Sequence, residues 1–189
     1  IIGIFYTPWL ILTDLPLMNK LINGVIRLSD YRLYSVLENL GYALIMVGLM
    51  IYSIGLYQVL SHLKKRILLT KGLYAVVRHP QYLGIFIWTL GFAMSGWRLI
   101  NYLMWLTLCY SYVLLAEYEE AELEEIFGKE YILYISKVPF VIPYLKLDSR
   151  SIEKVVSRRK IRIMIYSILY VTLLIACYYI IEPYIVVYR

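Results

Sequence analysis

Two short segments of this chain carry polar side chains that a purely structural protein would not need. The first contains Arg78, His79 and Tyr82, and the second is the acidic pair Glu119 and Glu120. A guanidinium, an imidazole and a phenol at the start of a helix can bind a charged group, because the first backbone amides of a helix are unpaired and attract negative charge. The sequence therefore predicts a ligand site in which a cationic mouth meets an acidic helix.

Each residue of the first segment also has a structural explanation. Arg78 could anchor a loop on the positively charged side of a membrane, and His79 could be solvated in that loop. Pro80 could begin the next helix, and Tyr82 could be an aromatic side chain at the membrane interface. The argument for a site rests on their combination, together with a second phenol at Tyr74.

The acidic pair opens an amphipathic helix that we expect over residues 117–137. Its apolar stripe recurs at helical spacing and consists of Leu123, Phe127, Tyr131 and Tyr134. Helical geometry directs Glu119 and Glu120 towards this buried side, whereas Glu122 and Glu125 project away from it. A carboxylate on an apolar face is costly unless it is paired, so both residues are expected to have partners.

Three further residues bear on the partners, the bend and the end of this helix. An ion pair between the acidic residues and a basic loop residue such as Arg78 is the structural alternative to ligand binding. Gly128 predicts a bend, because glycine costs about 1 kcal/mol in a helix interior. Pro139 predicts that the helix ends before it, since the residue preceding a proline is pushed out of the α region.

The composition places these elements in a membrane. Of the 189 residues, 61% are hydrophobic and 17% are charged, whereas soluble domains have about 45–50% and about 25%. The formal net charge of +6 follows from Lys and Arg clustered between apolar segments, so no nucleic acid is expected as a partner. Cys109 and Cys177 have neither metal nor redox spacing, so no metal site is predicted.

We predict an all-α fold, a polytopic membrane helical bundle with about five transmembrane helices plus a cytoplasmic amphipathic helix. The expected spans are residues 1–12 (the remaining part of a first span), 40–60, 82–97, 99–116 and 161–181. The short interval between the third and fourth spans contains Ser95 and Gly96, which predicts a tight helical hairpin. The first residue is Ile1 rather than Met, which leaves the true N-terminus open, and no signal-peptide cleavage site is visible.

The distribution of basic residues predicts the orientation. Residues 61–79 and 117–160 are rich in Lys and Arg, so both loops should lie on the cytoplasmic side, with Arg189 outside. Asp148 is a plausible N-cap for a last helix. The basic turn at 158–160 is interpreted as a membrane anchor against anionic headgroups.

Glycines recur every seven residues in two of the expected spans, at Gly41, Gly48 and Gly55 and at Gly84 and Gly91. Seven residues are nearly two helical turns, so each set lies along one face. Such faces of small residues allow close helix packing in a membrane.

Beyond these physical arguments, the sequence resembles a known family. The run Leu-Thr-Lys-Gly-Leu-Tyr-Ala-Val-Val-Arg-His-Pro-Gln-Tyr-Leu-Gly at 69–84 is similar to the signature of the isoprenylcysteine carboxyl methyltransferase and phospholipid methyltransferase family. The pattern Glu-Glu-x-x-Leu-x-x-x-Phe-Gly-x-x-Tyr-x-x-Tyr at 119–134 is similar to the same signature. It is followed by Val-Pro at 138–139 and Ile-Pro at 142–143. Arg-His-Pro alone is weak evidence for this family. The two motifs together, with a hydrophobic hairpin between them, are specific evidence for it.

The resemblance covers residues 67–143, which we treat as a methyltransferase-like core within a single membrane domain of residues 1–189, with 148–189 forming the basic turn and last span. It implies S-adenosyl-L-methionine as cofactor and a lipid or prenylated acceptor, with the active site facing the cytoplasm. On the matching positions, the cofactor would be bound by Leu69, Tyr74, His79, Pro80, Tyr82 and Glu119. Arg78 and Glu120 would orient the reacting groups.

One departure from the family pattern bears on the acceptor. The carboxyl methyltransferase branch places an arginine one helical turn before the first matched glutamate, where this chain has Leu115. Phe140 also stands where basic residues are common in the family. The sequence therefore leaves open a lipid amine, a hydroxyl, a thiol, or a carboxylate bound by Arg78. A membrane NADPH-dependent reductase with related C-terminal motifs and a non-enzymatic scaffold are the competing hypotheses.

Overall fold

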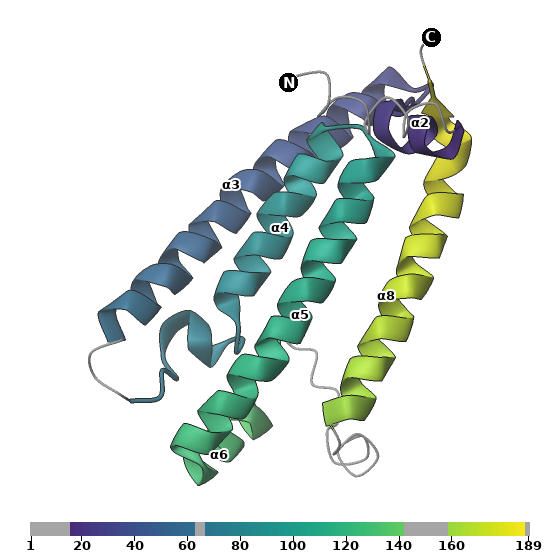
Figure 1. Ribbon diagram of the computed structural model, residues 1–189. Helices are drawn as coiled ribbons and strands as arrows, with labels where there is room; N and C mark the ends of the chain where they lie inside the picture. Colours follow the sequence, from purple (N-terminus) through teal and green to yellow (C-terminus); the bar gives the residue numbers. More distant parts are fainter. Residues whose placement is uncertain (1–15, 63–66, 142–158, 188–189) are drawn as a thin grey trace, which may run out of the picture.

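The computed structural model of the protein describes residues 16–62, 67–141 and 159–187. In chain order its elements are α2 (Pro16–Asn23), β1 (Val25–Ile26), α3 (Tyr31–His62), η2 (Gly72–Ala75), α4 (Pro80–Ser95), α5 (Leu99–Phe127), α6 (Lys129–Lys137), α8 (Arg159–Ile181), η3 (Glu182–Tyr184) and β2 (Ile185–Val186). Figure 1 shows a bundle of long helices with α2 at one end and α6 at the other. The prediction of an all-α membrane fold is confirmed, apart from two strands of two residues each.

Three of the described helices are long and apolar enough to cross a membrane: Tyr31–His62, Leu99–Phe127 and 161–184. The predicted span at 82–97 corresponds to α4, which has 16 residues and is about 24 Å long at 1.5 Å per residue. The predicted span at 1–12 and the N-cap at Asp148 lie outside the described residues. The predicted count of five spans is therefore not confirmed, whereas the membrane character of the chain is.

The glycine repeats bring α3 and α4 into close contact, as their spacing predicts. Gly41, Gly48 and Gly55 are the buried residues of α3. A Cβ atom added to Gly84 would lie 2.6 Å from the backbone nitrogen of Tyr52 and 2.9 Å from the carbonyl oxygen of Gly48. The two backbones are so close at this contact that only glycine fits. The contact therefore sets the position of α4 along α3.

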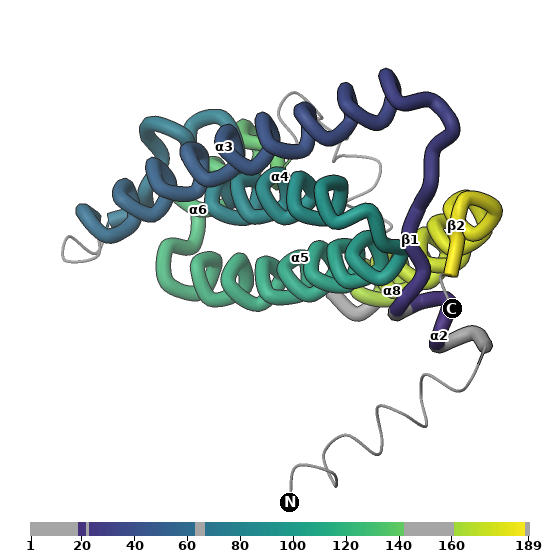
Figure 2. Tube along the Cα trace, turned by 90° about the horizontal axis from the view of Figure 1, so that it is seen from above, coloured from purple at the N-terminus to yellow at the C-terminus, as the bar shows by residue number. Residues whose placement is uncertain are grey.

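Polar contacts join α5 to α8. The Tyr110 hydroxyl lies 2.8 Å from Ser167 Oγ, and the Thr107 hydroxyl lies 2.9 Å from that of Tyr170. The rings of Tyr110 and Tyr170 stack with their centroids 4.4 Å apart. Seen from above, α4 lies between α3 and α5, and α8 lies beside α5 (Figure 2).

Two boundaries differ from the predicted ones. Helix α3 begins at Tyr31 rather than near residue 40. At this start, Asp30 Oδ1 accepts a hydrogen bond from the Arg32 backbone N–H. Helix α5 continues through residue 117, where we expected the span to end and a separate amphipathic helix to begin. No glycine or proline interrupts the chain there, so one helix carries both the hydrophobic span and the acidic motif.

The predicted bend occurs at Gly128. Helix α5 ends at Phe127, Gly128 adopts φ 51° and ψ −122°, and α6 begins at Lys129. A side chain is strained at such a positive φ, so glycine permits the sharp reversal. Helix α6 ends at Lys137, before Pro139, as predicted.

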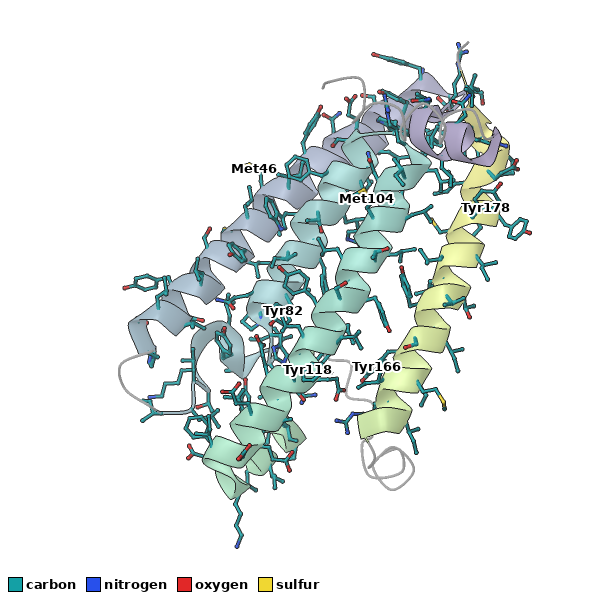
Figure 3. The ribbon with its side chains drawn as sticks, in the orientation of Figure 1. Met46, Tyr82, Met104, Tyr118, Tyr166 and Tyr178 are labelled. Carbon is teal, nitrogen blue, oxygen red and sulfur yellow. The ribbon has the colours of Figure 1, made fainter. Side chains whose placement is uncertain are left out.

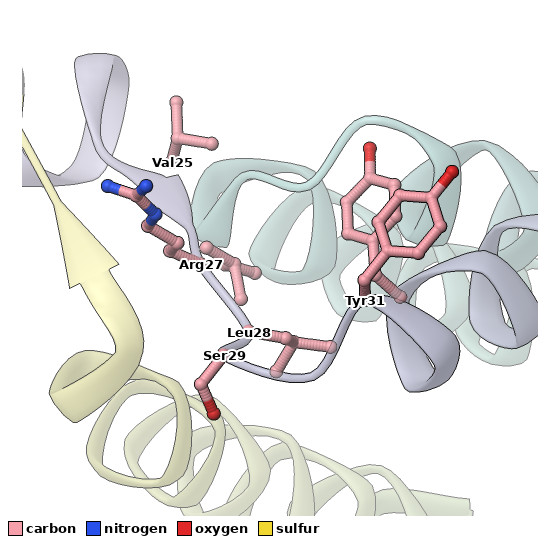
Figure 4. Close-up of a pocket in the computed structure, with 7 residues that line it drawn as sticks. Val25, Arg27, Leu28, Ser29 and Tyr31 are labelled. Carbon is pink, nitrogen blue, oxygen red and sulfur yellow. The ribbon is translucent and has the colours of Figure 1, made fainter.

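The opposite end of the bundle is held by backbone pairing. Strand β1 pairs antiparallel with β2, Val25 opposite Val186, and the Ile26 backbone N–H donates to the Trp97 carbonyl at 2.7 Å. A cavity of about 310 Å³ lies beside β1, lined by Val25, Ile26, Arg27, Leu28, Ser29, Tyr31 and Tyr34 (Figure 4). It lies at the far end of the molecule from the segments that drew attention in the sequence.

Candidate active site

The two motif segments meet at the end of the bundle that carries α6. Arg78 and His79 lie directly before α4, and their backbone N–H groups donate to the carbonyls of Pro139 and Phe140 at 2.9 and 3.2 Å. The chain that follows α6 therefore pairs with the chain that precedes α4. Tyr82, on the first turn of α4, and Tyr118, on α5, lie towards this end in Figure 3.

Arg78 is held by the acidic helix. Its Nη1 donates to Glu120 Oε2 at 2.8 Å, and its guanidinium carbon lies 5.3 Å from the centroid of the Phe140 ring. The side chains of Arg78 and Glu120 are 17% and 16% exposed, so this is a largely buried pair. Within the described part of the chain, Arg78 Nε is buried without a hydrogen-bond partner. The same guanidinium also interacts with the phenol of Tyr131.

His79 contacts both acidic residues. Its Nε2 lies 3.0 Å from Glu120 Oε1, and its Nδ1 lies 3.7 Å from Glu119 Oε2. The residue is 8% exposed, so it is not the solvated loop histidine of the structural explanation. Its ring stacks on that of Tyr82 at 5.1 Å between centroids, and Phe140 meets it edge-on at the same distance.

The two carboxylates differ in exposure. Glu120 is 16% exposed and fully committed to Arg78 and His79, whereas the Glu119 side chain is 45% exposed. The Tyr82 hydroxyl interacts with the Glu119 carboxylate. Burial raises the pKa of the Tyr74 phenol, with smaller contributions from Tyr134 and Glu119. Glu119 is therefore the carboxylate that remains open to a ligand, with two phenols beside it.

Helix α6 closes the site from below through its own tyrosines. The Tyr134 hydroxyl donates to the Tyr74 carbonyl oxygen at 2.7 Å. Burial raises the pKa of Tyr134 to about 12. Tyr131, Tyr134 and Val138 form a buried cluster against which the predicted stripe residues Leu123 and Phe127 pack. The expected apolar face is confirmed, and it fixes α6 against α5 and η2.

The remaining predicted site residues frame the mouth. Pro80 is fully buried as the first residue of α4, as its sequence position predicts. Leu69 is half-buried, and its neighbour Leu68 packs against the α6 cluster. Glu122 and Glu125 are exposed, so helical geometry separated the inward and outward acids correctly. The structure thus brings Arg78, His79, Tyr82, Glu119 and Glu120 together.

One charged pair next to this group was not predicted. Glu117 is 5% exposed, and both of its oxygens accept hydrogen bonds from Arg162 of α8, Nε to Oε1 at 3.0 Å and Nη2 to Oε2 at 2.6 Å. The sequence analysis used Glu117 only as the first residue of the amphipathic stretch, and it interpreted the basic turn at 158–160 as a membrane anchor. The available signal was that both charges lie within apolar helical runs, where a charge needs a partner.

The site lies at the rim of the membrane. The stretch of α5 from Leu99 to Glu119 is about 30 Å long, which matches the hydrocarbon thickness of a typical bilayer of about 30 Å. The acidic residues therefore emerge where the helix leaves the apolar layer.

The arrangement can bind a small ligand that carries both signs of charge. An open carboxylate suits a cationic group, a buried guanidinium donor suits a carboxylate, and aromatic rings suit either a flat base or a cation. No cluster of metal-ligating side chains occurs among the residues described.

The architecture defines an α-helical integral membrane protein with a cluster of charged side chains at one end of its helical bundle. Residues 36–130 match the phospholipid methyltransferase family, which is half of the chain, and the chain belongs to this family. The match contains the Arg-His-Pro segment, α4, α5 and the acidic motif.

Curated relatives agree with this assignment. The chain is similar to the protein-S-isoprenylcysteine O-methyltransferase of Schizosaccharomyces pombe, at 41% identity over 88 residues, covering 43% of this chain and 35% of that protein. It is 32% identical over 81 residues to protein-S-isoprenylcysteine O-methyltransferase B of Arabidopsis thaliana (41% of this chain, 40% of the relative). It is 36% identical over 92 residues to the human protein-S-isoprenylcysteine O-methyltransferase, a match that covers 42% of this chain and 28% of the human protein.

These matches span between 28% and 40% of the relatives' own lengths. No solved structure matches the chain.

Proposed function

We propose that this chain is a membrane methyltransferase that uses S-adenosyl-L-methionine to methylate a lipid-soluble acceptor. The observation that carries the proposal is the open carboxylate of Glu119 beside the stacked rings of His79 and Tyr82, next to the buried pair of Arg78 and Glu120. The family match and the names of the relatives, which are methyltransferases, support the same reaction class.

The residues present fit this cofactor. S-adenosyl-L-methionine carries an ammonium, a carboxylate and a sulfonium. Glu119 would accept from the ammonium and attract the sulfonium, while the buried Arg78 Nε would donate to the carboxylate. Tyr74, His79 and Tyr82 would provide aromatic surface, and Leu69 and Pro80 would provide apolar walls.

When bound, the cofactor supplies a methyl group activated by its attachment to a positively charged sulfur. The work of the protein is alignment and exclusion of water. Alignment of two bound reactants can contribute on the order of 7–11 kcal/mol to lowering a barrier. The His79 ring, stacked on Tyr82 and met edge-on by Phe140, would exclude water from the inner wall of the site. Arg78 and Glu120, which orient the reacting groups in this proposal, act as one paired unit rather than as independent residues.

The surroundings of the site favour an acceptor with a neutral nucleophile. Leu115 is 46% exposed and apolar, so it offers no charge to a carboxylate. Arg78 is engaged by Glu120 and lies over Phe140, and its Nε is assigned here to the carboxylate of the cofactor, so Arg78 is not available to a carboxylate of the acceptor. We therefore favour a lipid headgroup amine, with an isoprenylcysteine carboxylate of the kind named for the relatives as the second class. The acceptor would enter laterally between helices, and the cofactor would enter from the cytoplasm.

Titration of the detergent-solubilised protein with S-adenosyl-L-methionine and with NADPH tests the cofactor. Binding of the methyl donor with no binding of NADPH is the expected result, and Arg78→Ala, His79→Ala or Glu119→Ala should each weaken it by about 1–3 kcal/mol. Binding of NADPH alone would favour the reductase hypothesis. Binding of neither, in wild type and variants alike, would favour a scaffold.

Incubation with radiolabelled methyl donor identifies the acceptor class. The protein is supplied in parallel with total lipid extract and with a prenylated cysteine analogue. We expect label in the amine-bearing lipid fraction. Label in the prenylcysteine alone, released by mild base as expected for a methyl ester, would assign the carboxylate class instead.

A further inference from the structure

Among the described residues outside the family match, α8 brings a charged side chain close to the site. Arg162 lies on α8, beyond the matched residues 36–130. It binds both oxygens of Glu117, which stands two residues before Glu119 and three before Glu120 on α5. In helical geometry, residues three apart share a face, so Glu117 and Glu120 lie on the same side of α5.

We propose that Arg162 is a positioning residue of the methyl-transfer site, which sets the rotation of α5 through Glu117 and so aims Glu119 and Glu120. This inference rests on the proposed function. It assigns to the last span a role in the active site, in place of the membrane-anchoring role suggested by the basic turn before it.

The first argument is charge. Three carboxylates fall within about 4.5 Å of rise along α5, and like charges this close repel one another unless each has a partner. The structure gives each a different environment: Glu117 is paired with Arg162, Glu120 with Arg78 and His79, and Glu119 is left open. Neutralising Glu117 from α8 leaves Arg78 and His79 available to Glu120.

The second argument is geometry. A bidentate contact between a guanidinium and a carboxylate fixes orientation as well as distance. Glu117 is 5% exposed, and Tyr166 of α8 also interacts with it. In Figure 3, Tyr166 lies on the side of α8 that faces α5. The helix cannot turn about its axis without breaking this contact, so Glu119 keeps its direction towards His79 and Tyr82.

The chain offers a matched control on the same helix pair. Tyr170 of α8 contacts the Thr107 hydroxyl of α5 at 2.9 Å, about 15 Å along the helix from Glu117. Tyr170→Phe removes a contact between α5 and α8 without approaching the site. Arg162→Lys preserves the charge but loses the bidentate geometry.

The test measures cofactor affinity, turnover and amide hydrogen exchange for each variant. Arg162→Met should lower kcat by about 10- to 100-fold, because a misplacement of about 1 Å can cost about 100-fold. It should weaken cofactor binding and raise exchange at residues 117–122. Arg162→Lys should recover part of the loss, and Tyr170→Phe should retain wild-type affinity, turnover and exchange at 117–122.

Removal of one partner of a buried pair can prevent folding, so a second variant removes both. Glu117→Met/Arg162→Met replaces the pair by apolar side chains of similar length. It should fold and still show reduced kcat. Wild-type kinetics in this double variant, or equal kinetic losses in Arg162→Met and Tyr170→Phe, would overturn the proposal.

The exchange measurement also separates the two proposals. If the wild type binds no S-adenosyl-L-methionine, the proposed function fails, whereas greater exchange at 117–122 in Arg162→Met than in Tyr170→Phe still supports positioning by Arg162. If the wild type binds the cofactor and exchange at 117–122 is the same in all variants, the proposed function survives and the role of Arg162 fails.

Discussion

At the scale of single residues, the neighbouring carboxylates of Glu117, Glu119 and Glu120 differ in burial and in their partners. Glu117 is 5% exposed and bound by Arg162, and Glu120 is 16% exposed and bound by Arg78. Glu119, at 45%, is the most exposed of the three, and it contacts His79 at 3.7 Å and the Tyr82 hydroxyl. Only the most exposed of the three is open to exchange its contacts for a ligand.

Replacement of Glu119 by glutamine should therefore affect binding more than folding. We expect Glu119→Gln to weaken S-adenosyl-L-methionine by about tenfold, because hydrogen bonds to charged groups contribute about 1.5–3 kcal/mol and this site is partly screened by solvent. Isothermal titration measures the change. Glu122→Gln, on the exposed face of the same helix, is the control and should bind as the wild type does. Equal affinities for the two variants would remove Glu119 from the cofactor site.

The sequence predicted which acids face inward, but not what each of them contacts. Glu119 and Glu120 were separated from Glu122 and Glu125 by helical geometry, which holds because α5 is regular through this stretch. The pairing of Glu117 with Arg162 joins residues 45 positions apart. Such a contact depends on how α8 docks against α5, which no local pattern specifies.

At the scale of elements, small residues set how closely the helices approach. The seven-residue spacing of glycines predicted close helix packing, and the structure shows that α3 and α4 are the helices that pack through these glycines. The boundary between span and amphipathic helix could not be predicted, because membrane and water both accept a continuous helix. The change of environment along α5 leaves its backbone unaltered.

Gly84→Ala should destabilise the bundle. Its Cβ would lie 2.6 Å from the Tyr52 backbone nitrogen, so α3 and α4 must separate, at a cost of about 1–3 kcal/mol as for other overpacked sites. Thermal unfolding in detergent measures the loss. Ala43→Leu adds a larger side chain at an exposed position of α3 and should leave the unfolding temperature near that of the wild type. A stable Gly84→Ala protein would mean that the two helices are not so closely packed.

The attachment of α6 should be sensitive to alkaline pH. The pKa of Tyr134 is raised by burial from 10.0 to about 12, so its contribution to folding is complete below pH 10 and is lost as the pH rises towards 12. Between pH 10 and pH 12, the unfolding free energy of Tyr134→Phe should fall less than that of the wild type. The substitution also removes the hydrogen bond to the Tyr74 carbonyl. Tyr118→Phe, at a side chain that is 61% exposed, should keep the wild-type pH dependence. An unchanged slope for Tyr134→Phe would exclude this residue as a source of alkaline unfolding.

At the scale of the whole molecule, the two ends of the bundle differ in chemistry. The end with α6 gathers the buried ion pairs of Arg78 and His79, while the end with α2 is held by the short β1–β2 pairing. Hydropathy predicted a membrane bundle with its polar motifs at one rim. The predicted count of five spans stays unconfirmed, because α4 has only 16 residues, fewer than the roughly 20 of a typical span, and residues 1–12 lie outside the described part of the chain.

The orientation inferred from the basic loops can be tested with single cysteines. Lys71 is exposed beside η2 at the site end, and Ser29 is exposed beside β1 at the opposite end. In a background with Cys109 and Cys177 replaced by alanine, a membrane-impermeant maleimide added to intact cells should label Ser29→Cys. Lys71→Cys should be labelled only after the membrane is permeabilised, because basic loops are retained in the cytoplasm.

Labelling of Lys71→Cys in intact cells, with Ser29→Cys protected, would reverse the assigned topology. The site would then open away from the cytoplasmic supply of S-adenosyl-L-methionine, and the proposed reaction would lack its methyl donor. The labelling pattern therefore decides whether the charged rim of the bundle can serve the chemistry that its residues suit.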